Sequence, residues 1–170
     1  MQRSEGTQDL QTVGAGGRRA TEPNIAGVRI VALGNVITRS GWMTEVFRTD
    51  WPGVEIVPRQ INFVHLSPNG VTDWHRHTGQ TDHLIGVSGV IKLVLCDGRP
   101  GSPTERATDV IRFGAICPLM VIIPAGVWHA LRNESGEPAA FLNITDQLYA
   151  YERPDNWRLP AEGHEIPDIL

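Results

Sequence analysis

The chain has 170 residues, of which 41% are hydrophobic and 20% charged, and its formal net charge is -4 at pH 7. This length suits one domain with a sizeable core, and the acidic balance leaves no basic surface for nucleic acid. The longest apolar runs reach about seven residues, against ~20 for a membrane span, and the N-terminus lacks the apolar segment of a signal peptide. We therefore expect a cytoplasmic protein without nucleic-acid or membrane partners.

The two ends of the chain differ from the middle. Residues 1–24 are rich in Gln, Gly, Thr, Ser and Arg and show no apolar periodicity, so they predict a disordered N-terminal tail. Residues 25–152 have the texture of a single domain. Residues 153–170 are expected to form a C-terminal tail, with one short helix at most after Tyr149.

Short strand candidates follow one another between turns that contain Gly and Pro. They cover residues 28–33, 43–47, 54–57, 60–66, 75–77, 83–87, 90–96, 107–113, 120–123, 130–132 and 139–145. Helical periodicity is almost absent. Regular short strands of this kind predict an all-β domain, a sandwich or barrel of jelly-roll type.

The residues with chemical potential gather in two stretches. In a strand alternate side chains share a face, so His75 and His77 point the same way. The sequence TGQT then indicates a turn, and the following apolar run is expected to return as an antiparallel partner that brings Asp82 near the pair. His129 follows a Pro-x-Gly turn at the start of another strand.

Two chemistries suit this set of residues. Neutral imidazoles and a carboxylate bind divalent Fe, Mn, Ni, Zn or Cu, and four ligands leave room for substrate or water; the set would be His75, His77, Asp82 and His129. Without metal, His75 and His77 would act as base and acid, because an imidazole pKa near neutrality suits proton abstraction beside a carbonyl. The histidines would otherwise only line a pocket, with Asp82 capping the hairpin.

The two stretches resemble the two motifs of the cupin superfamily. The first motif is matched by Gly70, His75, His77, Asp82 and Gly89, with Asp82 where the family usually has Glu and Gly70 one residue closer than usual. The second is matched at every position, by Pro124, Gly126, His129 and Asn133. The resemblance implies a cupin-type double-stranded β-helix, a jelly-roll barrel. It also implies a homodimer that pairs through edge strands.

A closer resemblance is to the dTDP-4-dehydrorhamnose 3,5-epimerase group of cupins, carried by residues 41–48, 60–62, 94–104 and 122–129. That group epimerises carbons beside a ketone in a nucleotide-linked sugar, without metal, and the resemblance places His75 at its base position. The chain departs from the group elsewhere. The arginine that holds the diphosphate falls at Thr72, the lysine of the following strand at Asp82, and the tyrosine acid at Asn143.

The related dTDP-sugar 3,4-ketoisomerases resemble the chain at residues 75–78, 87–89 and 92–98, and both of their histidines are present. We therefore interpret the chain as an epimerase-like cupin that binds a small carbonyl or sugar-like ligand, with His75 and His77 transferring a proton. One alternative is a metal-dependent dioxygenase or isomerase with a site of three histidines and one carboxylate. The other is a cupin that binds a small molecule without catalysis.

Overall fold

The computed structural model describes residues 11–15, 22–160, 164–167 and 169–170. All of the named elements within these residues are strands. In chain order they are β1 (Arg29–Ala32), β2 (Asn35–Thr38), β3 (Gly41–Thr44), β4 (Gln60–Leu66), β5 (His75–Arg76), β6 (Asp82–Ser88), β7 (Val90–Asp97), β8 (Thr108–Gly114), β9 (Leu119–Ile123), β10 (Val127–Asn133), β11 (Ala139–Thr145) and β12 (Trp157–Arg158).

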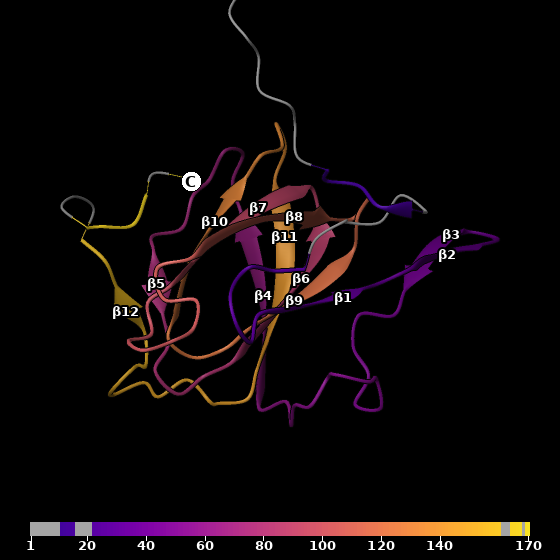
Figure 1. Ribbon diagram of the computed structural model, residues 1–170. Helices are drawn as coiled ribbons and strands as arrows, with labels where there is room; N and C mark the ends of the chain where they lie inside the picture. Colours follow the sequence, from indigo (N-terminus) through magenta and orange to yellow (C-terminus); the bar gives the residue numbers. More distant parts are fainter. Residues whose placement is uncertain (1–10, 16–21, 161–163, 168) are drawn as a thin grey trace, which may run out of the picture.

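Two five-stranded antiparallel sheets face each other (Figure 1). The first has the strand order β1-β9-β6-β11-β4 and the second the order β12-β5-β10-β7-β8. From β4 onward the chain crosses from one sheet to the other at almost every connection, which is the winding of a jelly roll. The prediction of an all-β, cupin-type barrel is confirmed.

The main core lies between the two sheets and follows from alternation along the strands. On β7, Ile91, Leu93 and Leu95 are fully buried, and on β8 Ile111 and Phe113 face the same interior. The first sheet contributes side chains to the same cluster, among them Leu84, Val121, Ile123 and Phe141. Burial of one such side chain stabilises the fold by about 1.5–3 kcal/mol, so this cluster fixes the distance between the sheets.

The outer faces of both sheets are also covered. Val54 is 2% exposed and packs with Ile85 and Met120 on the outer side of the first sheet. The prediction of a strand at 54–57 is therefore wrong: its apolar residues belong to an irregular segment that covers a sheet. The second sheet is covered by residues that follow β12, including Leu159 and Ile166.

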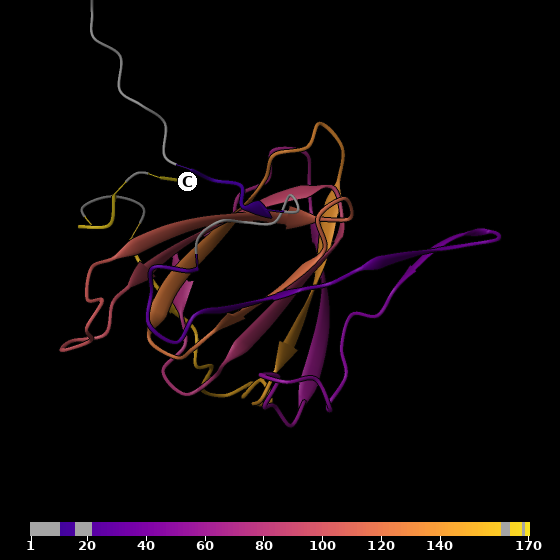
Figure 2. The same ribbon diagram turned by 45° about the vertical axis from the view of Figure 1, so that its right-hand side comes forward.

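The strand predicted at 43–47 is displaced. The structure instead has a hairpin of β2 and β3, which pair from Asn35↔Thr44 to Thr38↔Gly41. The chain leaves this hairpin at Thr44, and Val46 and Phe47 then pack on the outer cluster of the first sheet. In both ribbon views the hairpin extends away from the body of the molecule (Figures 1 and 2).

The predicted hairpin between the strand of His75 and the strand that begins at Asp82 is wrong. β5 pairs with β10 and β12, whereas β6 pairs with β9 and β11. The two strands belong to opposite sheets, and the connection between them crosses from one sheet to the other. Asp82 therefore reaches the histidines across the interior rather than along a ladder.

The predicted domain boundaries stay predictions. Most of the predicted N-terminal tail, residues 1–10 and 16–21, lies outside the described residues. Within the predicted C-terminal tail, β12 pairs with β5 through Trp157↔Arg76 and Arg158↔His75. Among the described residues, no helix has the length and apolar character needed to span a membrane.

Candidate active site

Strand pairing brings the first and second motifs together. In the ladder between β5 and β10, His75 lies directly opposite His129. Their ring centroids are 4.1 Å apart, and His129 is 2% exposed. The buried sheet therefore sets the position of both rings, and neither depends on a flexible loop.

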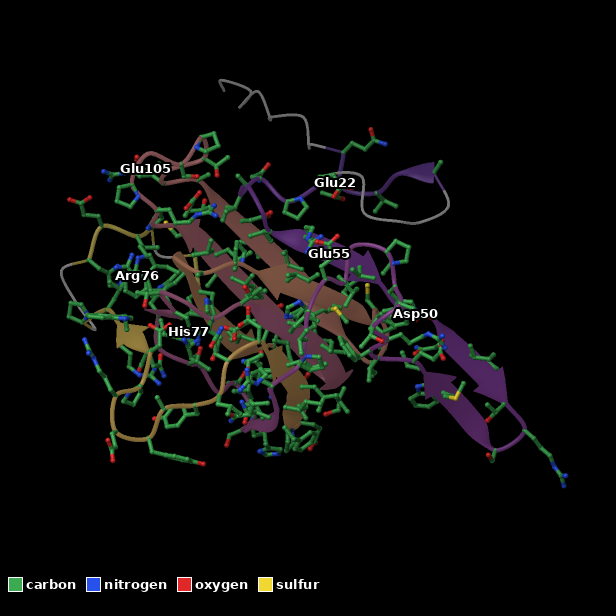
Figure 3. The ribbon with its side chains drawn as sticks, turned by 90° about the horizontal axis from the view of Figure 1, so that it is seen from below. Glu22, Asp50, Glu55, Arg76, His77 and Glu105 are labelled. Carbon is green, nitrogen blue, oxygen red and sulfur yellow. The ribbon has the colours of Figure 1, made fainter. Side chains whose placement is uncertain are left out.

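His77 lies just beyond β5 and is held by contacts from two distant segments. The backbone N–H of Gly126 donates a hydrogen bond of 2.7 Å to the carbonyl oxygen of His77. Gly126 has a φ of +86°, and a Cβ there would meet the Arg99 side chain at 2.5 Å, so the turn requires glycine. The Nδ1 of His77 bonds to the backbone oxygen of Asp155. Figure 3 shows His77 beside β12, across the molecule from the β2–β3 hairpin.

Asp82 reaches two of the histidines from the other sheet. It is 1% exposed, and its Oδ2 lies 3.2 Å from Nε2 of His77 and 3.3 Å from Nε2 of His129. Its Oδ1 accepts hydrogen bonds from the side-chain amides of Gln80, at 2.7 Å, and Asn143, at 3.1 Å. None of these four groups carries a permanent charge.

In each of the three imidazoles, Nδ1 contacts a backbone carbonyl oxygen. The Nδ1 atoms of His75 and His129 lie 3.0 and 3.1 Å from the backbone oxygens of Asp73 and Val127, and His77 makes the equivalent contact. Because a carbonyl oxygen only accepts, each Nδ1 carries a proton, and in the neutral ring each Nε2 presents a lone pair. One ligand atom from each ring lies within 4.8 Å of the others. The site therefore concentrates acceptor atoms.

The surroundings shift the pKa values of the histidines in opposite directions. Burial lowers the pKa of His75 to about 3, and the neighbouring His129 adds to that effect. Burial also lowers the pKa of His77, but the hydrogen bond and charge of Asp82 outweigh it and leave that pKa raised. The pKa of the Asp82 carboxyl is well below its usual value, because hydrogen bonds from His129 and His77 overcome the effect of burial.

His75 and His77 face a cavity of about 550 Å³. Most other side chains in its wall are polar and uncharged. They come from β4 and β11, from the turn before β6 and from the segment after β11, and include Gln60, Asn62, Gln80, Asn143, Thr145, Gln147, Tyr149 and Asn156. The wall also contains one carboxylate, that of Asp155.

Several of these wall residues do not stand out in the sequence as site residues. Alternation gave a signal for some of them: Gln60 and Asn62 are two apart on β4, and the register places Thr145 and Asn143 opposite them. The segment that carries Tyr149 and Asp155 has no such periodicity.

Two motif positions are structural. Asn133 is fully buried, and its Nδ2 donates to the backbone oxygens of Ser67, at 3.0 Å, and Glu137, at 2.8 Å. Its backbone N–H donates to the oxygen of Gly70 at 2.9 Å. These contacts tie the start of the first motif to the end of the second, and so support the strands that carry the histidines.

The fold and this site together define an epimerase-like cupin: a jelly-roll barrel with the motif histidines at a polar cavity. No protein-family model matches the chain. The chain is 35% identical over 141 residues to the probable low-salt glycan biosynthesis epimerase Agl13 of Haloferax volcanii, an alignment that covers 82% of this chain and 90% of the relative. The chain thus belongs to the same family as this glycan biosynthesis epimerase, and its cupin fold resembles that of the dTDP-sugar isomerase and epimerase group.

Solved structures agree with this assignment. The dTDP sugar isomerase of Desulfovibrio desulfuricans G20 superposes with a TM-score of 0.78 and is 26% identical, over 85% of this chain and 90% of that one. The dTDP-4-dehydrorhamnose 3,5-epimerase of Bacillus anthracis, determined with TDP and PPi bound, has a TM-score of 0.75 over 85% of each chain. At 18% identity, that second likeness shows the fold alone.

Proposed function

We propose that this protein is an isomerase or epimerase that moves a proton on a carbon beside the ketone of a sugar-like ligand. The observation that carries the proposal is the placement of His75. Its Nδ1 donates a hydrogen bond to the backbone oxygen of Asp73, and its Nε2 has no hydrogen-bond partner among the described residues. The ring lines the cavity together with His77, which offers a base and a second proton-transfer group to one ligand.

The proposed reaction begins when Nε2 of His75 takes a proton from the carbon next to the carbonyl. The C–H electron pair forms a carbon–carbon double bond, and the carbonyl oxygen becomes an enolate oxygen. Return of a proton to the other face of the same carbon re-forms the ketone and inverts that carbon. Where that carbon carries a hydroxyl, the enolate is an enediolate: the hydroxyl proton passes to the former carbonyl oxygen and the returning proton adds to the former carbonyl carbon, which moves the carbonyl to the first carbon. Because the pKa of His75 is lowered, its ring is unprotonated at neutral pH and Nε2 has a free lone pair for this step.

His77 complements this base. Its pKa is raised by its contact with Asp82, so His77 is protonated more readily than His75. A protonated His77 stabilises negative charge on the enolate and supplies the proton that returns. Neighbouring groups whose pKa values are pushed apart in this way mark the acid and base of a proton-transfer site.

Proton exchange in deuterated water tests the proposal. The protein is incubated with a 4-keto-6-deoxyhexose, free and linked to dTDP, and deuterium at the carbons beside the ketone is followed by NMR. We expect incorporation that falls by about 10²–10⁴-fold in His75→Asn. His65→Asn is the matched control, because His65 is exposed on β4 and is not in the cavity wall. If neither sugar exchanges with the wild-type protein, the proposal fails.

A metal-dependent isomerase or dioxygenase is a second candidate, favoured by the convergence of lone pairs. When neutral, His77 and His129 both direct Nε2 at the Asp82 carboxylate, so a proton or a cation must lie between them. His75, His77, His129 and Asp82 provide the nitrogen and oxygen ligands that Fe, Mn, Ni, Zn and Cu accept, and the backbone bonds at Nδ1 orient the rings as in known metal sites. A bound metal would supply Lewis-acid polarisation of a carbonyl or activation of oxygen.

Elemental analysis of protein purified without chelator or His tag tests this candidate. We expect about one equivalent of a transition metal per chain if the lone pairs hold an ion, since one cluster of ligands holds one ion. The His75→Ala, His77→Ala double variant must then lose it. Equal metal content in both proteins would reject the site.

We also propose that two copies of the chain form a homodimer. The β2–β3 hairpin exposes Ile37 and Trp42, at 89% and 64%, and the edge strand β4 exposes Ile61 and Phe63. An unpaired strand edge with apolar side chains is a surface that folded proteins usually cover. Light scattering should give twice the chain mass, and Trp42→Ser should shift the protein toward monomer while Tyr151→Ser does not.

The cytoplasmic location stays a prediction.

A further inference from the structure

The segment that carries β12 runs back along the strand of the first motif. β12 pairs with β5 in antiparallel register, and one of the pairs is Trp157↔Arg76. Continued by two residues, the same register places Asp155 opposite Thr78. Asp155 thus meets the chain directly after His77, beyond the end of β5.

The carboxylate of Asp155 is occupied by donors from the protein. Its Oδ1 accepts hydrogen bonds from the backbone N–H and the hydroxyl of Thr78, at 2.9 and 2.6 Å, and from Nε1 of Trp157 at 3.2 Å. Its Oδ2 accepts from the backbone N–H of Gly79 at 2.8 Å and lies 2.9 Å from the N–H of Thr78. A carboxylate has about four lone-pair sites. These four donor groups therefore leave it little capacity for a ligand, although it lies in the cavity wall.

The main chain of the same residue meets His77. The backbone oxygen of Asp155 accepts the hydrogen bond of Nδ1 of His77, and Nε2 of that ring lies 3.2 Å from Oδ2 of Asp82. The two parts of Asp155 thus hold consecutive residues of one segment: the carbonyl holds His77, and the carboxylate holds Thr78 and Gly79. A displaced carboxylate would move the carbonyl with it.

Of the three motif histidines, His77 is the one whose ring depends on a distant segment. The Nδ1 atoms of His75 and His129 bond to backbone oxygens only two residues earlier, those of Asp73 and Val127. His77 takes the equivalent contact from 78 residues away. Its orientation therefore needs support that its own strand does not provide.

We propose that Asp155 is a positioning residue for His77. Its carboxylate anchors the bend that begins at Thr78, and its backbone oxygen thereby fixes the ring of His77 with Nε2 directed at Asp82. The consequence for exchange rests on the proposed function, in which His77 transfers a proton, whereas the anchoring does not. This role differs from that of a base or a ligand contact, which a carboxylate in a cavity wall would otherwise suggest.

The Nδ1 proton of His77 provides a readout that does not depend on catalysis. A ring N–H that is hydrogen-bonded to a carbonyl is protected from exchange with water and gives a resolved resonance in the NMR spectrum of the full chain with isotopically labelled histidine. His77→Asn assigns the resonance. We expect it in the wild type and expect its loss in Asp155→Ala. Its absence from the wild type, or its persistence in Asp155→Ala, would overturn the inference.

Asp146→Ala is the matched control. Oδ1 of Asp146 accepts the backbone N–H of Thr81 at 2.9 Å, in the same connection between β5 and β6, and Asp146 is not in the cavity wall. The two substitutions remove the same kind of hydrogen bond, but only that at Asp155 bears on His77. We expect Asp146→Ala to match the wild type in the His77 resonance and in exchange. An equal loss there would mean that any loosening of this connection has the same effect, against the inference.

Asp155→Asn tests the anchoring by the side chain. It keeps one acceptor oxygen for Thr78, whereas Asp155→Ala keeps none. We expect the asparagine variant to retain the His77 resonance and to exchange within about three-fold of the wild-type rate. Equal losses in the two variants would show that the charge is required rather than the anchoring, and the inference would fail.

The exchange experiment separates this inference from the proposed function. With the keto sugar that the wild type exchanges, Asp155→Ala should lower the rate at saturating sugar by about ten-fold or more and leave the half-saturating concentration within about three-fold. A raised half-saturating concentration with an unchanged saturated rate would make Asp155 a ligand contact and contradict the inference. A wild type that exchanges neither sugar, but whose His77 resonance is lost in Asp155→Ala, would support the inference and reject the proposed function.

Discussion

Two buried carboxylates, Asp82 and Asp97, show how the same group serves the site in one region and the fold in another. Each is 1% exposed. Asp97, at the end of β7, accepts hydrogen bonds from Nε and Nη2 of Arg99, at 2.7 and 2.8 Å, and from the hydroxyls of Ser102 and Thr104. Asp82 instead contacts two imidazoles and two amides, and no arginine or lysine in the described part of the chain contacts it.

The difference lies in the positive partner. Arg99 remains charged at all relevant pH values, so the charge of Asp97 is permanently compensated. The partners of Asp82 are histidines, whose charge depends on a proton or on a bound cation. A carboxylate with a permanent cation is a structural feature, whereas one with an exchangeable partner retains chemistry. Exchange activity should therefore depend on Asp82, and stability on Asp97.

The largest expected effect is on activity. Asp82→Asn removes the charge that keeps His77 protonated, so deuterium incorporation into the keto sugar should fall by about 10²-fold or more. Asp97→Asn, measured per folded molecule, should keep its rate within about two-fold, because Asp97 contacts no residue of the cavity wall and general acid–base groups act only within hydrogen-bond reach. An Asp97→Asn rate as low as that of Asp82→Asn would remove the distinction between the two carboxylates.

The second effect is on stability, and there the order reverses. Asp97→Asn places an NH₂ group among the donors of Arg99, Ser102 and Thr104 and removes the charge that pairs with the half-buried guanidinium of Arg99, which should lower the free energy of unfolding by about 1.5–3 kcal/mol. Asp82→Asn instead offers its NH₂ to the lone pairs of His77 and His129, so at pH 8 it should lower the free energy by less than about 1 kcal/mol.

Urea unfolding followed by circular dichroism measures both values. An Asp82→Asn loss as large as that of Asp97→Asn would show that His77 carries a proton at pH 8 and depends on the carboxylate as Arg99 does.

The sequence predicted the histidine cluster better than the contacts around Asp82. Alternation on one strand and a Pro-x-Gly turn suffice to place His75, His77 and His129 on two strands, and the pairing of β5 with β10 joins them. The approach of Asp82 was expected for the wrong reason, a hairpin. The residues between His77 and Asp82 favour a hairpin when they are considered alone. In the folded protein β5 and β6 lie in opposite sheets, whose inner faces are buried against each other.

Other features depend on tertiary packing that local patterns do not contain. The backbone oxygen of Asp155 orients His77 from 78 residues away, and a carbonyl group has no sequence signature. Asp97 pairs with Arg99 where β7 ends, beside Pro100 and Pro103, and no local pattern in that stretch predicts the pairing. The apolar residues at 54–57 predicted a strand because covering a sheet and forming one require similar residues.

The pH dependence of stability separates the two carboxylates again. The pKa of Asp97 is lowered, chiefly because the hydrogen bonds of Arg99 outweigh burial, so its stabilisation is present above the unfolded pKa of about 3.9 and lost as the pH falls below it. The pKa of His77 is raised, so its stabilisation is present below about 6.5 and lost as the pH rises through the folded value.

These directions give opposite trends in a comparison of variants. The difference in unfolding free energy between wild type and Asp97→Asn should shrink below about pH 4, and the difference between wild type and Asp82→Asn should shrink above about pH 6.5. The pKa of Asp82 is lowered like that of Asp97, so acid weakens the contribution of both carboxylates to stability. Only the range above about pH 6.5 therefore distinguishes Asp82 from Asp97. A constant Asp82→Asn difference from pH 6 to 9 would contradict the pairing with a protonated His77.

The smallest effects come from removing one hydrogen bond to each carboxylate. Ser102→Ala deletes a 2.6 Å contact to Asp97 and Gln80→Ala a 2.7 Å contact to Asp82. Each substitution should lower the free energy of unfolding by about 1 kcal/mol, because the remaining donors still form hydrogen bonds with both carboxylates. The two variants should differ in activity. Ser102→Ala should exchange deuterium at the wild-type rate. Gln80→Ala removes both a hydrogen bond that positions Asp82 and a side chain of the cavity wall, so it should slow exchange several-fold. Equal rates would mean that His77 and His129 alone position Asp82.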